Sequence, residues 1–125
     1  MRIKKIDFNS EEFRKVMKDA PKKLILFNEK ADYYCALIDG EIASICGIVK
    51  DRTGYKIVTS FTYEKYRGSH VMYKIVKYIL SKYKSDVYYV NSNEKSTRIF
   101  ERIGFKGVYT KRFKNFKRIA MILKE

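Results

Sequence analysis

The amino-acid sequence predicts an α+β fold: an α/β sandwich in which a mixed, mainly antiparallel central sheet is flanked by helices. Two patterns carry this prediction. Three consecutive strand-like segments are separated by short turn sequences, which is typical of antiparallel strands. Beyond them, apolar residues recur at helical spacing between further strand-like segments, which is typical of a helix packed on a sheet. The length of 125 residues fits one domain over residues 1–125.

The N-terminal region is predicted to form a strand and a helix. Residues 1–7 alternate between apolar and polar side chains, which favours a strand. Asn9 is followed three residues later by Glu12, a capping-box pattern that starts a helix. We expect this helix to run to about Ala20, because Pro21 lacks the N–H group that continuation requires.

Three antiparallel strands are expected next. A short apolar run at residues 23–27 gives no clear element type. Asp39 and Gly40 form a strong two-residue hairpin signal, and residues 51–54 form a second turn that ends in glycine. The expected strands are residues 33–38, 41–49 and 55–62.

Helices and strands alternate in the rest of the predicted chain. Six apolar residues between Ser69 and Lys82 recur at helical spacing, which predicts a helix with one face buried on the sheet. Gly104 is expected to stop a later helix in a left-handed conformation. The other expected elements are a strand at 86–90, a helix at 95–102, and two closing strands at 106–112 and 118–123.

Composition excludes several classes of protein. No run of about 18 apolar residues is present, and no apolar stretch follows a basic N-terminal flank. We therefore expect a cytoplasmic protein without a membrane partner. Cys35 and Cys46 lie in apolar runs without CxxC spacing, which indicates buried thiols rather than a zinc site or a disulfide framework. His70 is the only histidine and no clustered ligands accompany it, so no metal site is expected.

The net charge of +14 is concentrated toward the C-terminus. From Arg67 onward the chain has 15 of the 28 basic residues but only 4 of the 14 acidic ones. A basic surface attracts polyanions, which makes nucleic acid an expected partner. The codon bias of an AT-rich genome is the alternative explanation of the same lysine-rich composition. Residues 109–118 interleave cations and aromatic rings, which suits either phosphate contacts with base stacking or a solvated hairpin. The nucleic-acid candidates are Lys111, Arg112, Lys114, Lys117 and Arg118.

Two segments resemble motifs of a known family. Residues 93–105 read Asn-Glu-Lys-Ser-Thr-Arg-Ile-Phe-Glu-Arg-Ile-Gly-Phe. This resembles the last motif of the GNAT N-acetyltransferases, usually Asn-x-x-Ala-x-x-Leu-Tyr-x-x-x-Gly-Phe. Residues 67–72 lie where these enzymes have Arg or Gln-x-x-Gly-x-Gly or Ala. The element order is also similar, with one N-terminal helix where the family usually has two. The resemblance implies a GNAT-like fold.

The resemblance also implies a binding site for acetyl-coenzyme A. In the family, backbone amides at the start of a helix hold the pyrophosphate, because unpaired N–H groups and the helix dipole together attract anions. Here His70 and Met72 replace two small residues, which predicts weak or altered binding; the alternative is a plain turn with a solvated Arg67. The implied cofactor-binding residues are Phe61, Thr62, Arg67, Gly68, Ser69, His70, Val71, Met72, Asn93, Ser96 and Phe100.

Few acid and base groups accompany this implied site. Residues 55–62 contain no carboxylate to serve as general base, and Glu64 is the nearest candidate. The family's proton-donating tyrosine is replaced by Phe100, which cannot donate a proton. Ser92 lies near the expected acceptor side, and Asn93 is both a motif residue and a good N-cap. The catalytic candidates are therefore Glu64, Ser92 and Asn93, and the tyrosines that could replace the missing one are Tyr63, Tyr73 and Tyr89.

Two functional hypotheses from different classes follow. The first is an acyl-CoA-dependent N-acyltransferase that holds an acetyl donor and an amine where two strands splay, with catalysis resting on positioning and oxyanion stabilisation. The short N-terminal region favours a macromolecular amine acceptor. The second is a GNAT-like protein that modifies or binds nucleic acid, similar to phage DNA-modification proteins, and no longer uses acetyl-coenzyme A in the usual way. Either function suits a monomer or a homodimer.

Overall fold

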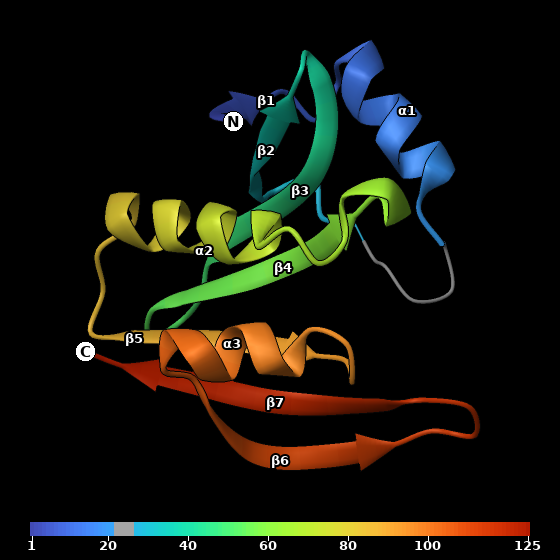
Figure 1. The fold of residues 1–125 in the computed structure, drawn as a ribbon. Coiled ribbons are helices and arrows are strands. Elements are labelled where there is room, and N and C mark those ends of the chain that lie inside the picture. Colours follow the sequence, from blue (N-terminus) through green and yellow to red (C-terminus); the bar gives the residue numbers. More distant parts are fainter. Residues whose placement is uncertain (22–26) are drawn as a thin grey trace.

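The computed structural model describes residues 1–21 and 27–125, which form a seven-stranded sheet with helices packed on it (Figure 1). The predicted apolar run at 23–27 lies largely outside the described residues. The elements are, in chain order, β1 (Arg2–Ile6), α1 (Glu11–Asp19), β2 (Asp32–Ile38), β3 (Glu41–Lys50), β4 (Tyr55–Thr62), the 3-10 helix η1 (Glu64–Tyr66), α2 (Val71–Lys82), β5 (Val87–Ser92), α3 (Thr97–Ile103), β6 (Lys106–Arg112) and β7 (Lys117–Lys124).

The strand order across the sheet is β1-β2-β3-β4-β5-β7-β6. Neighbouring strands are antiparallel except for β4 and β5, which are parallel. This mixed, mainly antiparallel sheet confirms the predicted α+β class. The pairing of β4 with β5 ends at Ile57 and Val90, although β4 continues to Thr62 and β5 to Ser92. The two strands therefore diverge toward their C-terminal ends.

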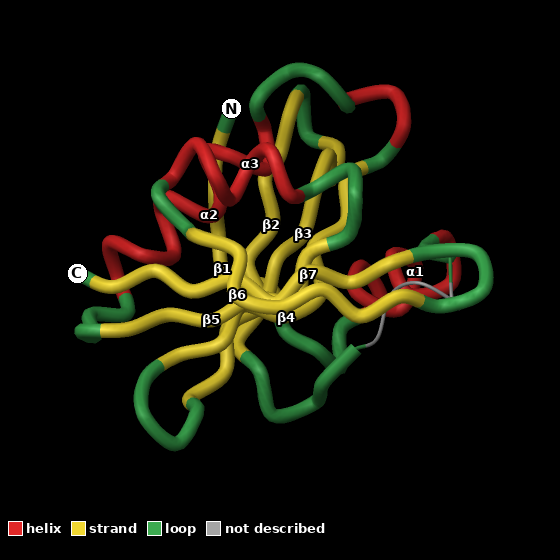
Figure 2. The backbone as a smooth tube through the Cα atoms, turned by 90° about the horizontal axis from the view of Figure 1, so that it is seen from below, coloured by secondary structure: helices red, strands yellow, loops and turns green. Residues whose placement is uncertain are grey.

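Helices cover both faces of the sheet. Side chains of α2 and α3 form one core cluster with residues such as Tyr34, Cys46 and Val90. Side chains of α1 form a second cluster with residues such as Cys35 and Ile45. Figures 1 and 2 show α2 and α3 together on one side of the strands, with α1 set apart from them. Both cysteines are free and fully buried, which confirms the prediction of core thiols.

Two predicted turns are confirmed by their backbone angles. Asp39 and Gly40 both have positive φ, 51° and 81°, as a two-residue type I′ hairpin requires. Gly104 has a φ of 122° and ends α3. Its N–H donates to the carbonyl of Phe100 at 3.1 Å, and the N–H of Phe105 donates to the same carbonyl at 2.9 Å. These bonds satisfy carbonyls that the helix end leaves unpaired.

The predicted start of α1 is wrong by one residue. Ser10, not Asn9, is the N-cap, and its Oγ accepts a hydrogen bond from the N–H of Phe13 at 3.1 Å. The N–H of Asn9 instead donates to Asp7 Oδ1 in the preceding turn. With Ser10 as the cap, two glutamates fall in the first turn of the helix, where negative charge is favoured by the helix dipole.

A β-bulge in β4 changes which side chains reach each face of the sheet. Cys46 pairs with Ser60 and Gly47 with Val58, so that Thr59 is the extra residue, with a φ of 53°. A bulge shifts the two-residue alternation of a strand. Accordingly, Ile57 packs in the α2 core but Phe61, four residues later, packs in the α1 core.

No helix among the described residues is long and apolar enough to cross a membrane.

Candidate active site

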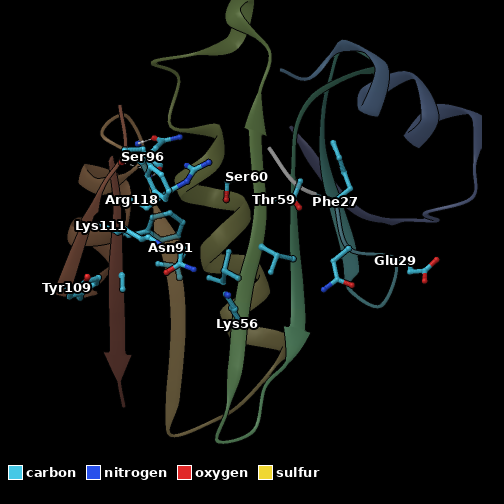
Figure 3. Close-up of a pocket in the computed structure, with 18 of the residues that line it drawn as sticks. Phe27, Glu29, Lys56, Thr59, Ser60, Asn91, Ser96, Tyr109, Lys111 and Arg118 are labelled. Carbon is cyan, nitrogen blue, oxygen red and sulfur yellow. Dashed lines mark hydrogen bonds between the residues drawn. The ribbon is translucent and has the colours of Figure 1, made fainter. Parts of the chain in front are cut away.

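Two cavities open where β4 and β5 diverge, and they share three lining residues. The α2 cavity, of about 370 Å³, is lined by the end of β4, the loop after η1 and the start of α2. The hairpin cavity, of about 870 Å³, extends toward the β6–β7 hairpin (Figure 3). Ser60, Asn93 and Ser96 line both cavities. These three residues mark a junction at which two ligands, one in each cavity, would meet.

The start of α2 provides backbone donors to the α2 cavity. The first hydrogen bond of the helix is donated by the N–H of Lys74 to the carbonyl of His70 at 3.1 Å. The amides of Val71, Met72 and Tyr73 therefore precede the helical hydrogen-bond ladder. Gly68 has a φ of 84°, and a Cβ added there would meet no atom within 4 Å. The loop thus leaves open space in front of an anion-attracting helix end.

His70 takes up the backbone conformation of a glycine. Its φ of 62° and ψ of 17° are left-handed, a region that costs a side-chain-bearing residue about 1–2 kcal/mol. Its Nδ1 lies 3.2 Å from Arg102 Nη1. Because a guanidinium only donates hydrogen bonds, Nδ1 is the acceptor in this contact. The loop therefore forms a left-handed turn although His70 carries a side chain, and the imidazole is oriented by α3.

The backbone strain at His70 predicts an unusual order of stability among its variants. We expect His70→Gly to be more stable than His70→Ala by about 1 kcal/mol, because both lose the imidazole but only alanine keeps the left-handed penalty. In an ordinary helix position the order is reversed. Urea denaturation of the two variants measures the difference. An alanine variant as stable as the glycine variant would contradict the left-handed conformation at this position.

The charge of the α2 cavity is positive. Arg67, Lys95 and Arg102 line it, and none of its described lining residues is acidic. Arg67 is held by a hydrogen bond from its Nε to the carbonyl of Thr62 at 3.1 Å. Arg102 lies over the ring of Tyr73, with its Cζ 5.0 Å from the ring centroid. The cavity therefore combines backbone amides with oriented cations, an arrangement that suits phosphate groups.

The other residues implied for cofactor binding lie mostly in the wall of this cavity. Val71 and Met72 are only 3% and 6% exposed, and both belong to the core cluster under α2. The Met72 side chain is thus packed into the cavity wall. Phe61 is buried and also lines the cavity, whereas Ser69 does not line it and donates to the carbonyl of Tyr66.

Asn93 and Ser96 cap the turn that leads into α3. The N–H of Ser96 donates to Asn93 Oδ1 at 2.8 Å, and the N–H of Asn93 donates to Ser96 Oγ at 3.1 Å. This reciprocal pair has the pattern of a capping box around the turn, but the N-cap of α3 is Ser96, three residues after the predicted Asn93. Because Asn93 Oδ1 accepts the bond from Ser96, the side chain can offer a ligand the N–H groups of Nδ2 as hydrogen-bond donors. Phe100 is buried against Phe105, with ring centroids 5.4 Å apart, and lines the hairpin cavity.

A fully buried thiol, that of Cys46, lies next to the junction but lines neither cavity. Cys46 Sγ lies 3.6 Å from Ser60 Oγ. Burial raises the pKa of the Cys46 thiol to about 12, because the thiolate would be desolvated. At neutral pH the thiolate, which is the nucleophilic form, is therefore scarcely populated.

Two of the predicted catalytic residues lie away from both cavities. Ser92 is 2% exposed, and its hydroxyl contacts Thr97 Oγ1 at 2.9 Å and Met121 Sδ at 3.2 Å between β5, α3 and β7. Glu64 is exposed at the start of η1 and does not line either cavity. Neither position brings the side chain to the junction. Asn93 is the catalytic candidate that the structure places there.

The three tyrosines proposed as proton donors differ in position. Tyr73 lines the α2 cavity. Tyr63 donates to Asp19 Oδ2 at 2.7 Å, and burial together with this carboxylate raises the pKa of its hydroxyl, which makes it a weaker acid. Tyr89 shares a hydrogen bond with Thr53 at 2.7 Å. Of these three, Tyr73 is the one that lines a cavity.

Cations and amides line the hairpin cavity. Lys56 comes from β4, and Lys111 and Arg118 are paired across β6 and β7. Figure 3 shows Lys56, Thr59 and Ser60 along β4, with Asn91, Lys111 and Arg118 on the side of β5 and β7. The described acidic residue that lines this cavity is Glu29, which is exposed and points away from it in Figure 3.

The aromatic rings of the hairpin contact each other. Phe113 and Phe116 stack with centroids 4.5 Å apart and an interplanar angle of 14°. Lys111 Nζ lies 5.3 Å from the centroid of Phe113, and Arg118 Cζ lies 5.5 Å from that of Phe116. Of the nucleic-acid candidates, Lys111 and Arg118 therefore lie in the hairpin cavity. The others lie outside it: Arg112 and Lys114 are exposed, and Lys117 forms an ion pair with Glu94 at 3.9 Å.

Sequence reasoning missed Lys56, Ser60 and Asn91 as site residues. Side chains of a strand alternate between the two faces of a sheet. Asn91 could therefore have been placed on the face opposite that of the buried Val90. Ser60 could not be placed in this way, because the bulge at Thr59 shifts the alternation of β4. A bulge of this kind leaves no clear mark in the sequence.

Comparisons with known proteins agree with this architecture. Solved structures with similar folds include an aminoglycoside 6'-N-acetyltransferase complexed with coenzyme A, with a TM-score of 0.78 and 13% identity, covering 99% of this chain and 97% of that one. They also include an IAA acetyltransferase from Bacillus cereus, with a TM-score of 0.78, 11% identity and 99% coverage of both chains. The ribosomal-protein-S18-alanine N-acetyltransferase from Escherichia coli has a TM-score of 0.77 and 8% identity, covering 98% and 92%.

Sequence comparison identifies the family. No curated protein sequence matches this chain significantly. Residues 3–123 match the family described as Acetyltransferase (GNAT) domain. This match spans nearly the whole chain, includes the two motifs at 67–72 and 93–105, and agrees with the fold of the solved structures. The chain therefore belongs to the GNAT acetyltransferase family.

Proposed function

We propose that this protein is an N-acetyltransferase that transfers the acetyl group of acetyl-coenzyme A to a primary amine on a macromolecular acceptor. The observation that carries the proposal is the junction of the two cavities. Ser60, Asn93 and Ser96 line both the α2 cavity and the hairpin cavity. A donor bound in one cavity and an amine bound in the other would therefore meet between β4 and β5.

The α2 cavity has the chemistry that coenzyme A requires. The pyrophosphate would lie at the amides of Val71, Met72 and Tyr73, where the helix dipole and unpaired N–H groups favour anions. Arg67 and Arg102 would neutralise phosphate charge from either side of this helix end. The pantetheine arm would follow the edge of β4 that faces away from β3, beyond Ile57, where the pairing of β4 with β5 has ended. The bound donor supplies an activated thioester carbonyl.

The transfer step needs a neutral amine and a place for the developing oxyanion. The amine nitrogen attacks the thioester carbonyl, the C–N bond forms, the C–S bond breaks, and the sulfur leaves as a thiolate. The amine releases one proton to water and the thiolate takes one from water. No carboxylate lines the junction among the described residues. The chain therefore contributes mainly positioning and hydrogen-bond donors such as Asn93 Nδ2.

The shape of the acceptor side supports a macromolecular acceptor. The described N-terminal region supplies one α-helix, α1, so this side carries little cover. The hairpin cavity is about 870 Å³, more than twice the volume of the α2 cavity. Such a site can admit a chain terminus or a side chain of a larger molecule. Among the similar structures, the ribosomal-protein-S18-alanine N-acetyltransferase is named for a protein acceptor.

A calorimetric titration with acetyl-coenzyme A tests the donor half of this proposal. Because a protein of net charge +14 attracts any polyphosphate, ATP serves as the matched polyanion. We expect acetyl-coenzyme A to bind at least about tenfold more tightly than ATP, since only the former has a pantetheine arm to contact β4. Equal affinities would mean that the α2 cavity recognises phosphate alone, and the proposal would fail.

A second candidate function is nucleic-acid modification or binding without the usual use of acetyl-coenzyme A. It is favoured by the exposed cations Arg112 and Lys114 at the hairpin tip, next to Lys111 and Arg118. Such binding releases counterions, so the logarithm of affinity falls linearly with the logarithm of salt concentration. A steep slope for an oligonucleotide, together with failure of acetyl-coenzyme A to outcompete ATP, would select this candidate. A flat response to salt would eliminate it.

A further inference from the structure

We propose that the acceptor amine belongs to an acidic protein segment, with carboxylates close to the amine, and that Lys56, Lys111 and Arg118 recognise these carboxylates. This inference rests on the proposed function, because it assigns the occupant of the hairpin cavity. It is more specific, because the proposed function leaves the charge of the acceptor open.

The first argument is the charge balance of the hairpin cavity. Three cationic side chains line it, from three different strands. The described acidic lining residue, Glu29, is exposed and points away from the cavity. An acceptor that carries several positive charges would be repelled here, whereas an anionic acceptor would be attracted. The amides of Asn28 and Asn91 add neutral hydrogen-bonding groups that suit a peptide backbone.

The second argument is that two of these cations are oriented. Lys111 and Arg118 lie opposite each other in the register of β6 and β7. Each lies near a ring of the stacked pair Phe113 and Phe116. Cation–π contacts and strand pairing limit the side-chain freedom that a flexible surface cation would lose on binding. Their charges are therefore held where a ligand in the cavity would meet them.

The third argument links the cations to the reaction. An ammonium group in this cavity would lie among positive charges, which disfavour the charged form and lower the pKa of the acceptor amine. The neutral amine is the nucleophile, and no carboxylate lines the junction to remove its proton. The three cations can therefore attract the acceptor through its carboxylates and, where their positive charge exceeds that of the bound carboxylates, favour the neutral amine.

The arrangement of the aromatic rings favours a peptide over a nucleic acid. Sequence-tolerant binding of single strands uses aromatic faces on which bases stack. At the hairpin, Phe113 and Phe116 each turn one face to the other ring. The cavity cations also converge on one recess instead of forming the extended stripe that a phosphate backbone follows.

Binding of a matched peptide pair, measured without acetyl-coenzyme A, tests the inference. One peptide has a free N-terminal amine followed by three glutamates, and the other has three glutamines. We expect the glutamate peptide to bind about tenfold or more tightly, because each carboxylate gains a charge-assisted contact. Equal binding of the two peptides would overturn the inference. Tighter binding of a single-stranded oligonucleotide of the same charge would also overturn it.

Charge-reversal variants locate the effect in the cavity. We expect the double variant K56E/K111E to lose the preference for the glutamate peptide and to prefer a matched lysine peptide, a gain that an unfolded variant cannot show. The control is R112E/K114E, which changes the net charge equally at hairpin positions that line neither cavity. If the control loses as much preference as K56E/K111E, binding reflects overall charge and the inference fails.

The two proposals fail in different experiments. The peptide titration contains no acetyl-coenzyme A, so its outcome does not depend on the α2 cavity. Conversely, the comparison of acetyl-coenzyme A with ATP contains no acceptor. Selective peptide binding without selective coenzyme binding would retain the acidic-segment site and remove acetyl transfer. The reverse result would retain acetyl transfer and remove the acidic acceptor.

Discussion

Replacing Arg102 by glutamate is expected to weaken the binding of coenzyme A by about tenfold to a hundredfold. Arg102 lines the α2 cavity, and its guanidinium lies 3.2 Å from His70 Nδ1 and over the ring of Tyr73. It is thus held next to the amides at the start of α2. The substitution removes a cation that we propose to contact phosphate and adds a negative charge at the same place. Isothermal titration with coenzyme A measures the loss.

The matched control for this prediction is Arg98→Glu. Arg98 is on the same helix, one turn earlier, and is exposed, but it does not line either cavity. Both variants change the net charge equally, so long-range attraction of the anionic ligand falls to a similar degree. We expect Arg98→Glu to weaken coenzyme A binding by no more than about threefold. Equal losses in the two variants would show that Arg102 acts through net charge alone.

The fold was predictable because its local signals agree with its tertiary structure. The turn at Asp39 and Gly40 needs two residues at positive φ, and the Asp-Gly pair in the sequence predicts such a turn. The helix at α2 has an apolar face because it packs on a sheet, and its buried residues include Ile75, Val76 and Ile79. A fold can be predicted from its sequence when local residue patterns and tertiary packing favour the same structure.

The site was less predictable because it depends on where strands diverge. The sequence does not indicate that pairing of β4 with β5 ends at Ile57, nor that the bulge at Thr59 brings Ser60 to the junction. Glu64 is the carboxylate nearest in sequence to β4, but its side chain is exposed at the start of η1 and lines neither cavity. The predicted turn that ends at Gly54 is present, but the sequence does not show that a Cβ there would lie 2.2 Å from the carbonyl oxygen of Val87.

The charge asymmetry was visible in the sequence, but its division in space was not. Counting showed an excess of cations after Arg67 without showing that the fold separates them. Arg67 and Arg102 line the α2 cavity, whereas Lys111 and Arg118 line the hairpin cavity. The two groups therefore face two different ligands in the proposed reaction. This separation is what allows charge changes in one cavity to be tested against binding in the other.

Replacing Phe13 by alanine is expected to lower the free energy of unfolding by about 3–5 kcal/mol, as for other large-to-small changes in a core. Phe13 is fully buried on α1, and its ring lies 4.6 Å from that of Tyr33, 5.0 Å from Phe8 and 5.6 Å from Phe27. The helix has nine residues, too few for stability without tertiary packing. The loss is a large part of the roughly 5–15 kcal/mol that stabilises a domain. Urea denaturation measures it.

The control is Phe113→Ala, the same chemical change at a ring that is 42% exposed. For this variant we expect the free energy of unfolding to fall by less than about 1 kcal/mol.

A second measurement distinguishes an effect on stability from an effect on ligand binding. Phe8 and Phe27 line the hairpin cavity, and the ring of Phe13 contacts both of their rings without lining the cavity itself. None of the three residues lines the α2 cavity. In the folded fraction of the Phe13 variant, affinity for an acceptor peptide should therefore fall more than affinity for coenzyme A. A uniform loss of both affinities would mean that α1 supports the whole sheet rather than the acceptor side.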